Sequence, residues 1–237
     1  MFNLTPWALP QDYKALVIGS GGAIGGAFAA HFQHDPLCGH VELIARSHTT
    51  GFDLADAQSI EQHAKAVAPS GSFHVIVGAT GALTIDGRGP DKALAALRED
   101  LLVQSFHFNA VGPALLLRHL SPLLASGPAV YAKLSAKVGS IADNHKGGWY
   151  GYRASKAAMN MILQTAAIEL QRRNPDLRVV ALQPGTVRSN LSKPFAANVA
   201  HLLEAEESVA GMVQALKNLA PKSGAHFVDY KGQDIPW

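Results

Sequence analysis

The sequence predicts one doubly wound α/β domain, with a parallel sheet of about seven strands and helices on both faces. Short apolar runs alternate with longer stretches of helical pattern along the chain, which is typical of βα units. The apolar runs are almost continuously hydrophobic, as expected for strands covered on both faces. A glycine-rich turn follows the first run. Because no repeat or linker interrupts this pattern, we expect a single domain over residues 1–237, with residues 1–13 as an N-terminal extension.

The expected strands are the short apolar runs, several of which end at a turn residue. The first run ends in glycines, the run over residues 73–77 ends at Gly78, and the run over residues 178–182 leads into Pro184 and Gly185. Phe52 marks a very short third strand. The complete set of strands is 15–18, 41–45, the position of Phe52, 73–77, 129–134, 178–182 and 225–230.

The expected helices are the longer stretches between these strands. They cover residues 23–32, 57–68, 91–124, 155–173 and 204–219. Asp53 is expected to cap the second helix. In the third helix, Pro113 lacks the N–H that would bond the carbonyl of Asn109. A kink and a bound water are therefore expected at Asn109.

Composition excludes several classes of protein. The chain has 48% hydrophobic and 16% charged residues, enough apolar material for a core. Its net charge is +2 with no block of like charges, so neither nucleic acid nor a membrane surface is an expected partner. The single cysteine, Cys38, favours a reducing compartment, and no signal peptide or spanning segment is predicted, so we expect the cytoplasm. No histidine pair has metal-binding spacing beside an acid, and no catalytic metal is expected.

The turn after the first strand has the composition of a phosphate-binding loop. Glycines let the backbone approach a pyrophosphate, and the N-terminus of the next helix offers unpaired N–H groups. A tight turn would also use glycine, but the position between a first strand and a first helix favours a dinucleotide in a Rossmann-type fold. The predicted contacts from this turn are Gly19, Ser20, Gly22, Ala23, Ile24 and Gly25.

The end of the second strand indicates which dinucleotide binds. An acid there bonds the ribose 2′-hydroxyl of NAD, whereas an arginine accommodates the 2′-phosphate of NADP. Arg46 holds this place, and no Asp or Glu does. A guanidinium binds phosphate through charge-assisted hydrogen bonds, so NADP is favoured and NAD remains possible. The alternative is an ordinary surface arginine.

Tyr152 and Lys156 are the candidate reacting residues. Four residues apart on a helix, their side chains share one face. A phenol titrates near pH 10, too high for proton transfer at neutral pH, but a nearby ammonium lowers that pKa. Tyr152 then becomes a usable general acid or base.

These motifs together resemble the short-chain dehydrogenase/reductase family, from Lys14 to the C-terminus. Within the family the chain is most similar to the C-factor-like branch, in residues 134–141, 147–156, 191–195 and 235–237. The glycine turn departs slightly from the family pattern, because Ile18 replaces a threonine and Ala23 a glycine. The family landmarks occur in order as the glycine turn, Asp53-Leu54, Gly78-Ala79-Thr80-Gly81, Asn109, Ser135, Tyr152 with Lys156, and Pro184-Gly185.

The resemblance implies a role for each landmark. Tyr152 would donate a proton to a carbonyl oxygen, or accept one in reverse, while Lys156 holds the nicotinamide ribose and lowers the pKa of Tyr152. Ser135 would bond the substrate oxygen, with Ser140 as its rival because the gap from serine to tyrosine is longer than usual. Asn109 would anchor a water that relays protons from Lys156. The resemblance adds as cofactor contacts Asp53, Leu54, Gly78, Ala79, Thr80, Tyr152, Lys156, Pro184, Gly185, Thr186 and Val187.

One landmark departs further from the family. Its Asn-Asn-Ala-Gly appears here as Gly78-Ala79-Thr80-Gly81. The small residues beside the cofactor remain, but the asparagine that helps lock the central sheet is absent, so lower stability is expected there. Residues 186–201 are expected to form a lid over the site.

The predicted function is reversible hydride transfer between NADP(H) and a small-molecule carbonyl/alcohol pair. One alternative is a nucleotide-binding signalling or regulatory protein with little turnover, since the C-factor branch is tied to developmental signalling. A second is a sugar-nucleotide epimerase or dehydratase, although those usually add a larger C-terminal region. The helices over residues 100–124 and 155–173 match the family's dimer interface, so a homodimer or homotetramer is expected.

Overall fold

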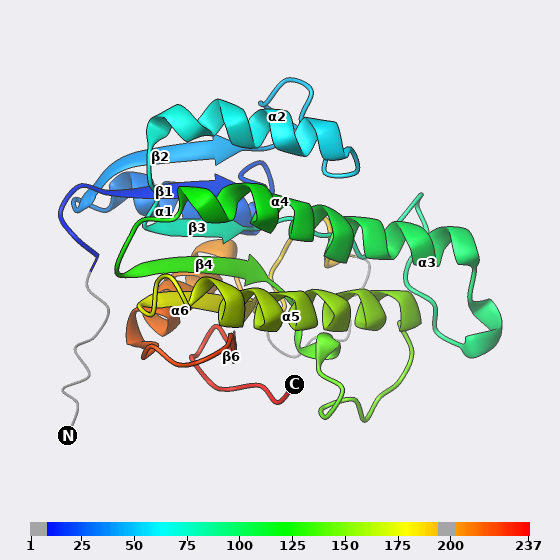
Figure 1. The fold of residues 1–237 in the computed structure, drawn as a ribbon. Coiled ribbons are helices and arrows are strands. Elements are labelled where there is room, and N and C mark those ends of the chain that lie inside the picture. The colour runs from blue at the N-terminus through cyan, green and yellow to red at the C-terminus, as the bar shows by residue number, and fades with distance from the viewer. Residues whose placement is uncertain (1–8, 194–201) are drawn as a thin grey trace.

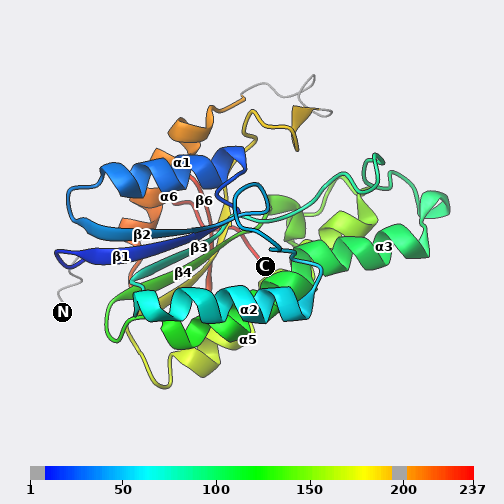
Figure 2. The same ribbon diagram turned by 90° about the horizontal axis from the view of Figure 1, so that it is seen from above.

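The computed structural model describes residues 9–193 and 202–237 and shows three layers, with a parallel sheet between two layers of helices (Figures 1 and 2). The sheet has the order β2-β1-β3-β4-β5-β6, and all its strand pairs are parallel. Its strands are β1 (Tyr13–Ile18), β2 (Cys38–Ile44), β3 (Val75–Gly78), β4 (Ala129–Leu134), β5 (Leu177–Gln183) and β6 (His226–Asp229). The doubly wound α/β fold is therefore confirmed.

The helices cover the two faces as the apolar pattern predicts. Figure 2 shows α1 (Ala23–His34) and α6 (Ala205–Asn218) on one face, with α2 (Ala57–Val67) and α5 (Tyr150–Leu170) on the other. Alternate residues of each strand serve the two layers: Leu16 and Ile18 of β1 pack with α2, α4 (Gly112–Leu120) and α5, whereas Ala15 and Val17 pack with α1 and α6. This alternation explains why the strands are apolar on both faces.

The described residues form six strands, one fewer than the expected count of about seven. Phe52 lies in a loop, where its buried ring meets the ring of His63 edge to face at 5.4 Å. Backbone groups of this loop form hydrogen bonds with a side chain of α2 and not with a neighbouring strand. Ser59 Oγ accepts from Asp53 N and donates to the Gly51 carbonyl, both at 2.8 Å. A strand at Phe52 is therefore not needed to pair these groups.

The cap of α2 also differs from the prediction. Asp56, not Asp53, is the N-cap residue, and its side chain accepts a hydrogen bond from Gln58 N at 2.9 Å. The Asp53 carboxylate accepts from Ala55 N at 2.9 Å. Asp53 therefore shapes the turn before the helix, with its side chain still close to the carboxyl edge of the sheet.

The expected helix over residues 91–124 is broken into parts. A loop and a short 3-10 turn precede α3 (Glu99–Phe106), a π-helical segment follows at His107–Val111, and α4 continues the same path. Figure 1 shows α3 and α4 as one long irregular helix across the face of the sheet. The π-helical segment contains Asn109, four residues before Pro113, where the missing N–H predicts a kink.

Helix α5 begins five residues earlier than predicted, at Tyr150 instead of Ser155. Gly147, Gly148 and Trp149 precede it with positive φ angles of 61°, 64° and 54°. This left-handed turn aims the start of α5 at the carboxyl edge of the sheet, so Tyr152 and Lys156 both lie in its first two turns.

Two predicted segments fall partly outside the described residues. These are the N-terminal extension, of which residues 1–8 are not described, and the predicted lid, of which residues 194–201 are not described. Within the described ranges, the structure has no helix long and apolar enough to cross a membrane.

Candidate active site

Two adjoining cavities lie at the carboxyl ends of the strands, where parallel α/β sheets bind ligands. Their volumes are about 490 and 730 Å³. Both are lined by the glycine turn and by the segment after β3, through Gly21, Gly22, Ala79, Thr80 and Gly81. The two cavities therefore share a wall and form one continuous site.

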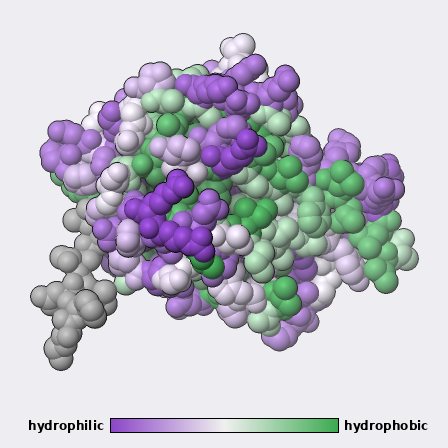
Figure 3. All heavy atoms as spheres, in the orientation of Figure 1, coloured by the Kyte–Doolittle hydropathy of each residue, from purple (hydrophilic) through white to green (hydrophobic). Residues whose placement is uncertain are grey.

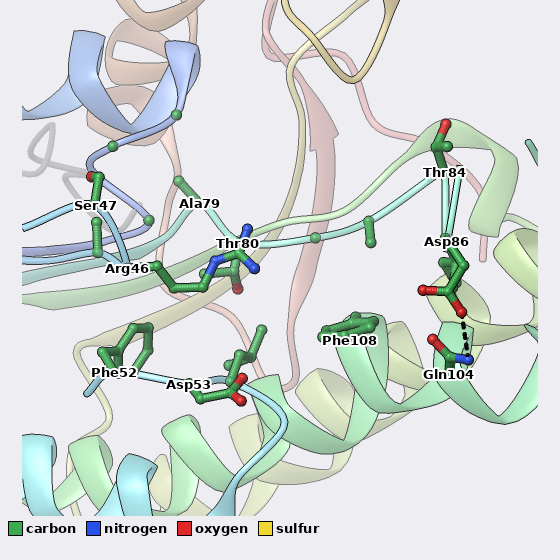
Figure 4. Close-up of a pocket in the computed structure, with 18 residues that line it drawn as sticks. Arg46, Ser47, Phe52, Asp53, Ala79, Thr80, Thr84, Asp86, Gln104 and Phe108 are labelled. Atoms are coloured by element: carbon green, nitrogen blue, oxygen red, sulfur yellow. Dashed lines mark hydrogen bonds between the residues drawn. The ribbon is translucent and has the colours of Figure 1, made fainter. Parts of the chain in front are cut away.

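The first cavity carries the residues predicted to recognise the adenosine end of a dinucleotide. Arg46, Asp53 and Leu54 line it, together with Phe52. Figure 4 shows the Arg46 side chain reaching into the space between Asp53 and Thr80. No hydrogen bond or ion pair joins the Arg46 guanidinium to any residue in the described part of the chain, so it can bind an anion in this cavity.

The glycine turn fits a bound phosphate group. A Cβ on Gly25 would lie 2.1 Å from the Gly19 carbonyl oxygen, and one on Gly21 would lie 2.2 Å from Ser47 Oγ. Helix α1 starts at the cavity with no side-chain cap and no acid in its first turn, so its N–H groups and positive dipole end face the site. Thr80 Oγ1 is buried there with no hydrogen-bond partner among the described residues. A polar ligand would satisfy these groups.

The second cavity brings together Ser135, Tyr152 and Lys156. Lys156 Nζ lies 5.6 Å from the centroid of the Tyr152 ring and donates to the Leu134 carbonyl at 3.3 Å. Lys156 is buried, whereas Tyr152 is partly exposed at the cavity. The phenol can therefore contact a ligand in the cavity, while the buried amino group lies near its ring.

Burial shifts the pKa values of both residues. It raises the pKa of Tyr152 to about 12, because the surrounding chain shields the phenolate from water. It lowers the pKa of Lys156 from 10.5 to about 8 for the same reason. The pKa of Tyr152 is therefore raised in this structure and not lowered as predicted, and the phenol holds its proton at neutral pH.

The two candidate serines lie in different places. Ser135 lines the cavity with Tyr152, and its hydroxyl donates to Asn160 Oδ1 at 2.6 Å. Ser140 lines a separate surface groove, where its oxygen accepts from Asp143 N at 3.0 Å. Ser140 thus has the bond of a turn cap, and Ser135 is the serine that shares a cavity with Tyr152.

Asn109 is buried beside the second cavity. Its side-chain amide clamps Ala82, accepting from Ala82 N at 2.9 Å and donating to the Ala82 carbonyl at 2.8 Å. A Cβ on Gly81 would lie 3.2 Å from both Asn109 Oδ1 and Lys156 Nζ. Asn109 therefore fixes the segment after β3 next to Lys156.

Most of the predicted site residues meet at the two cavities. Among the described residues, those that do not line either cavity are Ser20, Gly78, Asn109, Gly185, Thr186 and Val187. The Ser20 hydroxyl is turned inward, 3.4 Å from the Ile44 carbonyl and 3.1 Å from His48 Nε2. Val187 is buried and forms a bridge with Leu203. These residues therefore lie outside the lining of the two cavities.

Several lining residues were not predicted. Ser47 and Gly21 were within reach of prediction, because they neighbour Arg46 and the other glycines of the turn. Figure 4 shows Asp86, which accepts a hydrogen bond from Gln104 at 3.2 Å, at the far end of the first cavity beside Phe108. No local signal marks these residues, since a loop and a distant helix bring them together.

Comparison with known proteins agrees with this geometry. A family model described as short chain dehydrogenase matches residues 14–200. The chain is 34% identical to C-signal of Myxococcus xanthus over 137 residues, covering 57% of this chain and 78% of that protein. It is 30% identical to 1-hydroxy-2-glutathionyl-2-methyl-3-butene dehydrogenase of Rhodococcus sp. (strain AD45) over 192 residues, 79% of each chain.

Solved structures share the fold along nearly the whole chain. The NADPH-bound carbonyl reductase from chicken fatty liver superimposes with a TM-score of 0.81 at 20% identity, covering 97% of this chain and 100% of that one. Carbonyl reductase Sniffer of D. melanogaster gives a TM-score of 0.79 at 18% identity, with coverage of 96% and 100%. These structures share the fold, and the matching family model and the 30% identical relative confirm the predicted resemblance: the chain belongs to the short-chain dehydrogenase family.

Proposed function

We propose that this protein is an NADP-dependent reductase of carbonyl compounds, with Tyr152 as the proton donor. The observation that carries the proposal is the second cavity, in which Tyr152, Lys156 and Ser135 surround one space that continues into the glycine turn. A dinucleotide lying along the two cavities would have its phosphates at the start of α1 and its nicotinamide beside Tyr152. The nicotinamide, when bound, supplies the hydride.

The residues of the second cavity handle the proton. Because burial raises the pKa of Tyr152 to about 12, the phenol is protonated at pH 7 and suits the donor role in reduction. The Lys156 ammonium, with its pKa near 8, is mostly charged at that pH and stabilises the negative charge that the phenol acquires as its proton leaves. Ser135 lines the same cavity, and its hydroxyl, once released from Asn160 Oδ1, can donate the hydrogen bond that orients the substrate oxygen.

Asn109 fixes the backbone beside the proposed reaction centre. Its clamp on Ala82 keeps the segment after β3 close to Lys156. The π-helical segment turns backbone groups out of the regular helical pattern, which suits them to hold a water that returns a proton to Lys156.

Arg46 supports NADP as the cofactor. Its guanidinium lies in the first cavity without a protein partner in the described chain, at the end of β2 where a ribose 2′-phosphate is recognised. Ser47 lies beside it and adds a hydroxyl donor. The NADPH-bound carbonyl reductase from chicken fatty liver shares the fold, in line with this choice.

We also infer that two or four copies assemble through the face formed by α3, α4 and α5. Val103 of α3 is 58% exposed and Met161 of α5 is 66% exposed, which is unusual for large apolar residues. Figure 3 shows hydrophobic residues gathered on the right-hand half of this face. Light scattering should give the mass of a dimer or tetramer, and a monomeric mass would contradict the inference.

The test of function is a panel of aldehydes and ketones with NADPH or NADH, followed by nicotinamide absorbance. We expect turnover with NADPH in preference to NADH. A nucleotide-binding regulatory protein, the alternative suggested by the similarity to C-signal, would bind NADPH but reduce no carbonyl compound. That result would overturn the proposed activity.

A further inference from the structure

Lys133 is a buried lysine that the proposed function does not use. It lies in the apolar strand β4, and only 1% of its surface is exposed. A buried amino group destabilises the fold unless its hydrogen bonds are satisfied. Lys133 Nζ lies 3.1 Å from the Gly78 carbonyl oxygen and 3.3 Å from that of Leu134, and it also donates to the Thr80 carbonyl. Three carbonyl oxygens therefore surround the buried amino group as acceptors.

The side chain of Lys133 occupies space that Gly78 leaves open. The two residues are register partners in the neighbouring strands β3 and β4. A Cβ on Gly78 would lie 2.8 Å from Cδ of Lys133, so a side chain at position 78 and the lysine exclude each other. The amino group of a β4 residue therefore reaches the β3 backbone through the space that a glycine leaves.

Two of the carbonyls bound by Lys133, those of Thr80 and Leu134, belong to residues that line the proposed reaction centre. Thr80 borders both cavities. The Leu134 carbonyl also accepts a hydrogen bond from Lys156 at 3.3 Å, so the two amino groups share one acceptor. Burial and the neighbouring charge of Lys156 both lower the pKa of Lys133. The two lysines are therefore coupled through a shared hydrogen-bond acceptor and through charge.

We propose that Lys133 is a positioning residue: its amino group uses the space that Gly78 leaves open, ties the ends of β3 and β4 together, and sets the places of Thr80 and Lys156. The link to catalysis rests on the proposed function. The tie between the strands does not rest on the proposed function, because the melting temperature measures it without substrate or cofactor.

A double-mutant cycle tests the tie. Lys133→Val leaves buried carbonyls without a donor and should lower the melting temperature by about 5–10 °C. Gly78→Asn should also lower it, since the new side chain meets the lysine. In the double variant Gly78→Asn/Lys133→Val the steric clash is removed and the new amide can donate to the carbonyls that the lysine bound, so this variant should melt above either single variant. Lys65→Met on α2 removes only an exposed ion pair with Glu61, so it is the control and should lower the melting temperature by no more than about 2 °C.

The outcome that overturns the tie is a double variant that melts no higher than the less stable single variant. If both single variants fail to fold, a folded double variant still supports it, and an unfolded one contradicts it. No substrate or cofactor is needed for this experiment.

The link to the reaction centre is tested by the pKa of Lys156, measured by competitive acetic anhydride labelling and mass spectrometry. Without the second amino group, Lys156 has the Leu134 carbonyl to itself, so its pKa should rise above about 8 in Lys133→Val. It should stay raised in the double variant, although stability returns. An unchanged pKa in both variants would overturn the link. A chain that shows these results but reduces no carbonyl compound would refute the proposed function alone.

Discussion

Replacing Arg46 with alanine should weaken the binding of NADPH about 10- to 30-fold and leave the binding of NADH unchanged. The guanidinium has no partner among the described residues and lies in the first cavity, where charge-assisted hydrogen bonds to a 2′-phosphate would each contribute about 1.5–3 kcal/mol. Because Arg46 is exposed, water and salt screen the interaction, and we take the lower end, about 1.5–2 kcal/mol. Each 1.4 kcal/mol corresponds to about tenfold in affinity.

Isothermal titration with each cofactor, at low and at physiological ionic strength, measures this difference. The loss in Arg46→Ala should shrink as salt rises, since the contact is exposed. Arg172→Ala, an exposed arginine just beyond the end of α5, is the matched control and should bind both cofactors like the wild type. Equal weakening of NADPH and NADH, or no weakening of either, would refute the assignment of Arg46 to the 2′-phosphate.

Reductive kcat/KM should be level near neutrality and fall about tenfold per unit as pH rises past about 8, where Lys156 loses the proton that supports the phenol; a profile that stays level well above that pH would contradict this role. Gly25→Ala should lower the free energy of unfolding by about 3 kcal/mol or more, because its Cβ would lie 2.1 Å from the Gly19 carbonyl. Gly22→Ala, with its nearest neighbour 3.5 Å away, should change it by less than about 0.5 kcal/mol in the same urea titration, and equal losses would argue against the packing. His226 Nε2 is buried without a described partner, and desolvation lowers the pKa from 6.5 to about 4, so the unfolded chain binds a proton between these values that the folded chain does not. Stability should therefore fall by up to about 1.4 kcal/mol per unit as pH drops below 6.5, and His226→Leu should flatten this decline; identical slopes would contradict it.

The parts of the fold that were predictable are those that depend on local pattern. The strand over residues 129–134 was predicted with its observed bounds because it is a continuous apolar run between turn residues. The spacing of Tyr152 and Lys156 fixes a shared helical face wherever the helix begins, so the pair could be predicted although the start of α5 was misplaced. The place of the irregularity at Asn109 followed from the missing N–H of Pro113.

The parts that could not be predicted depend on contacts between distant residues. Phe52 resembles a strand residue by composition, but Ser59 and His63 of α2 take over the bonds of its loop. The elevated pKa of Tyr152 comes from how the folded chain encloses it, which no spacing reveals. Lys133 stood out only as a charge within an apolar run, and its meaning depends on Gly78 in the neighbouring strand.

The most direct test of the account is the rate of a single turnover, measured with NADPH already bound and a carbonyl substrate added, in the wild type and in Tyr152→Phe. Losing the proton donor should slow hydride transfer by about 10²- to 10⁴-fold, while the dissociation constant for NADPH stays the same because the ring is kept. A Tyr152→Phe variant that reduces the substrate at the wild-type rate would contradict the central claim that this phenol supplies the proton.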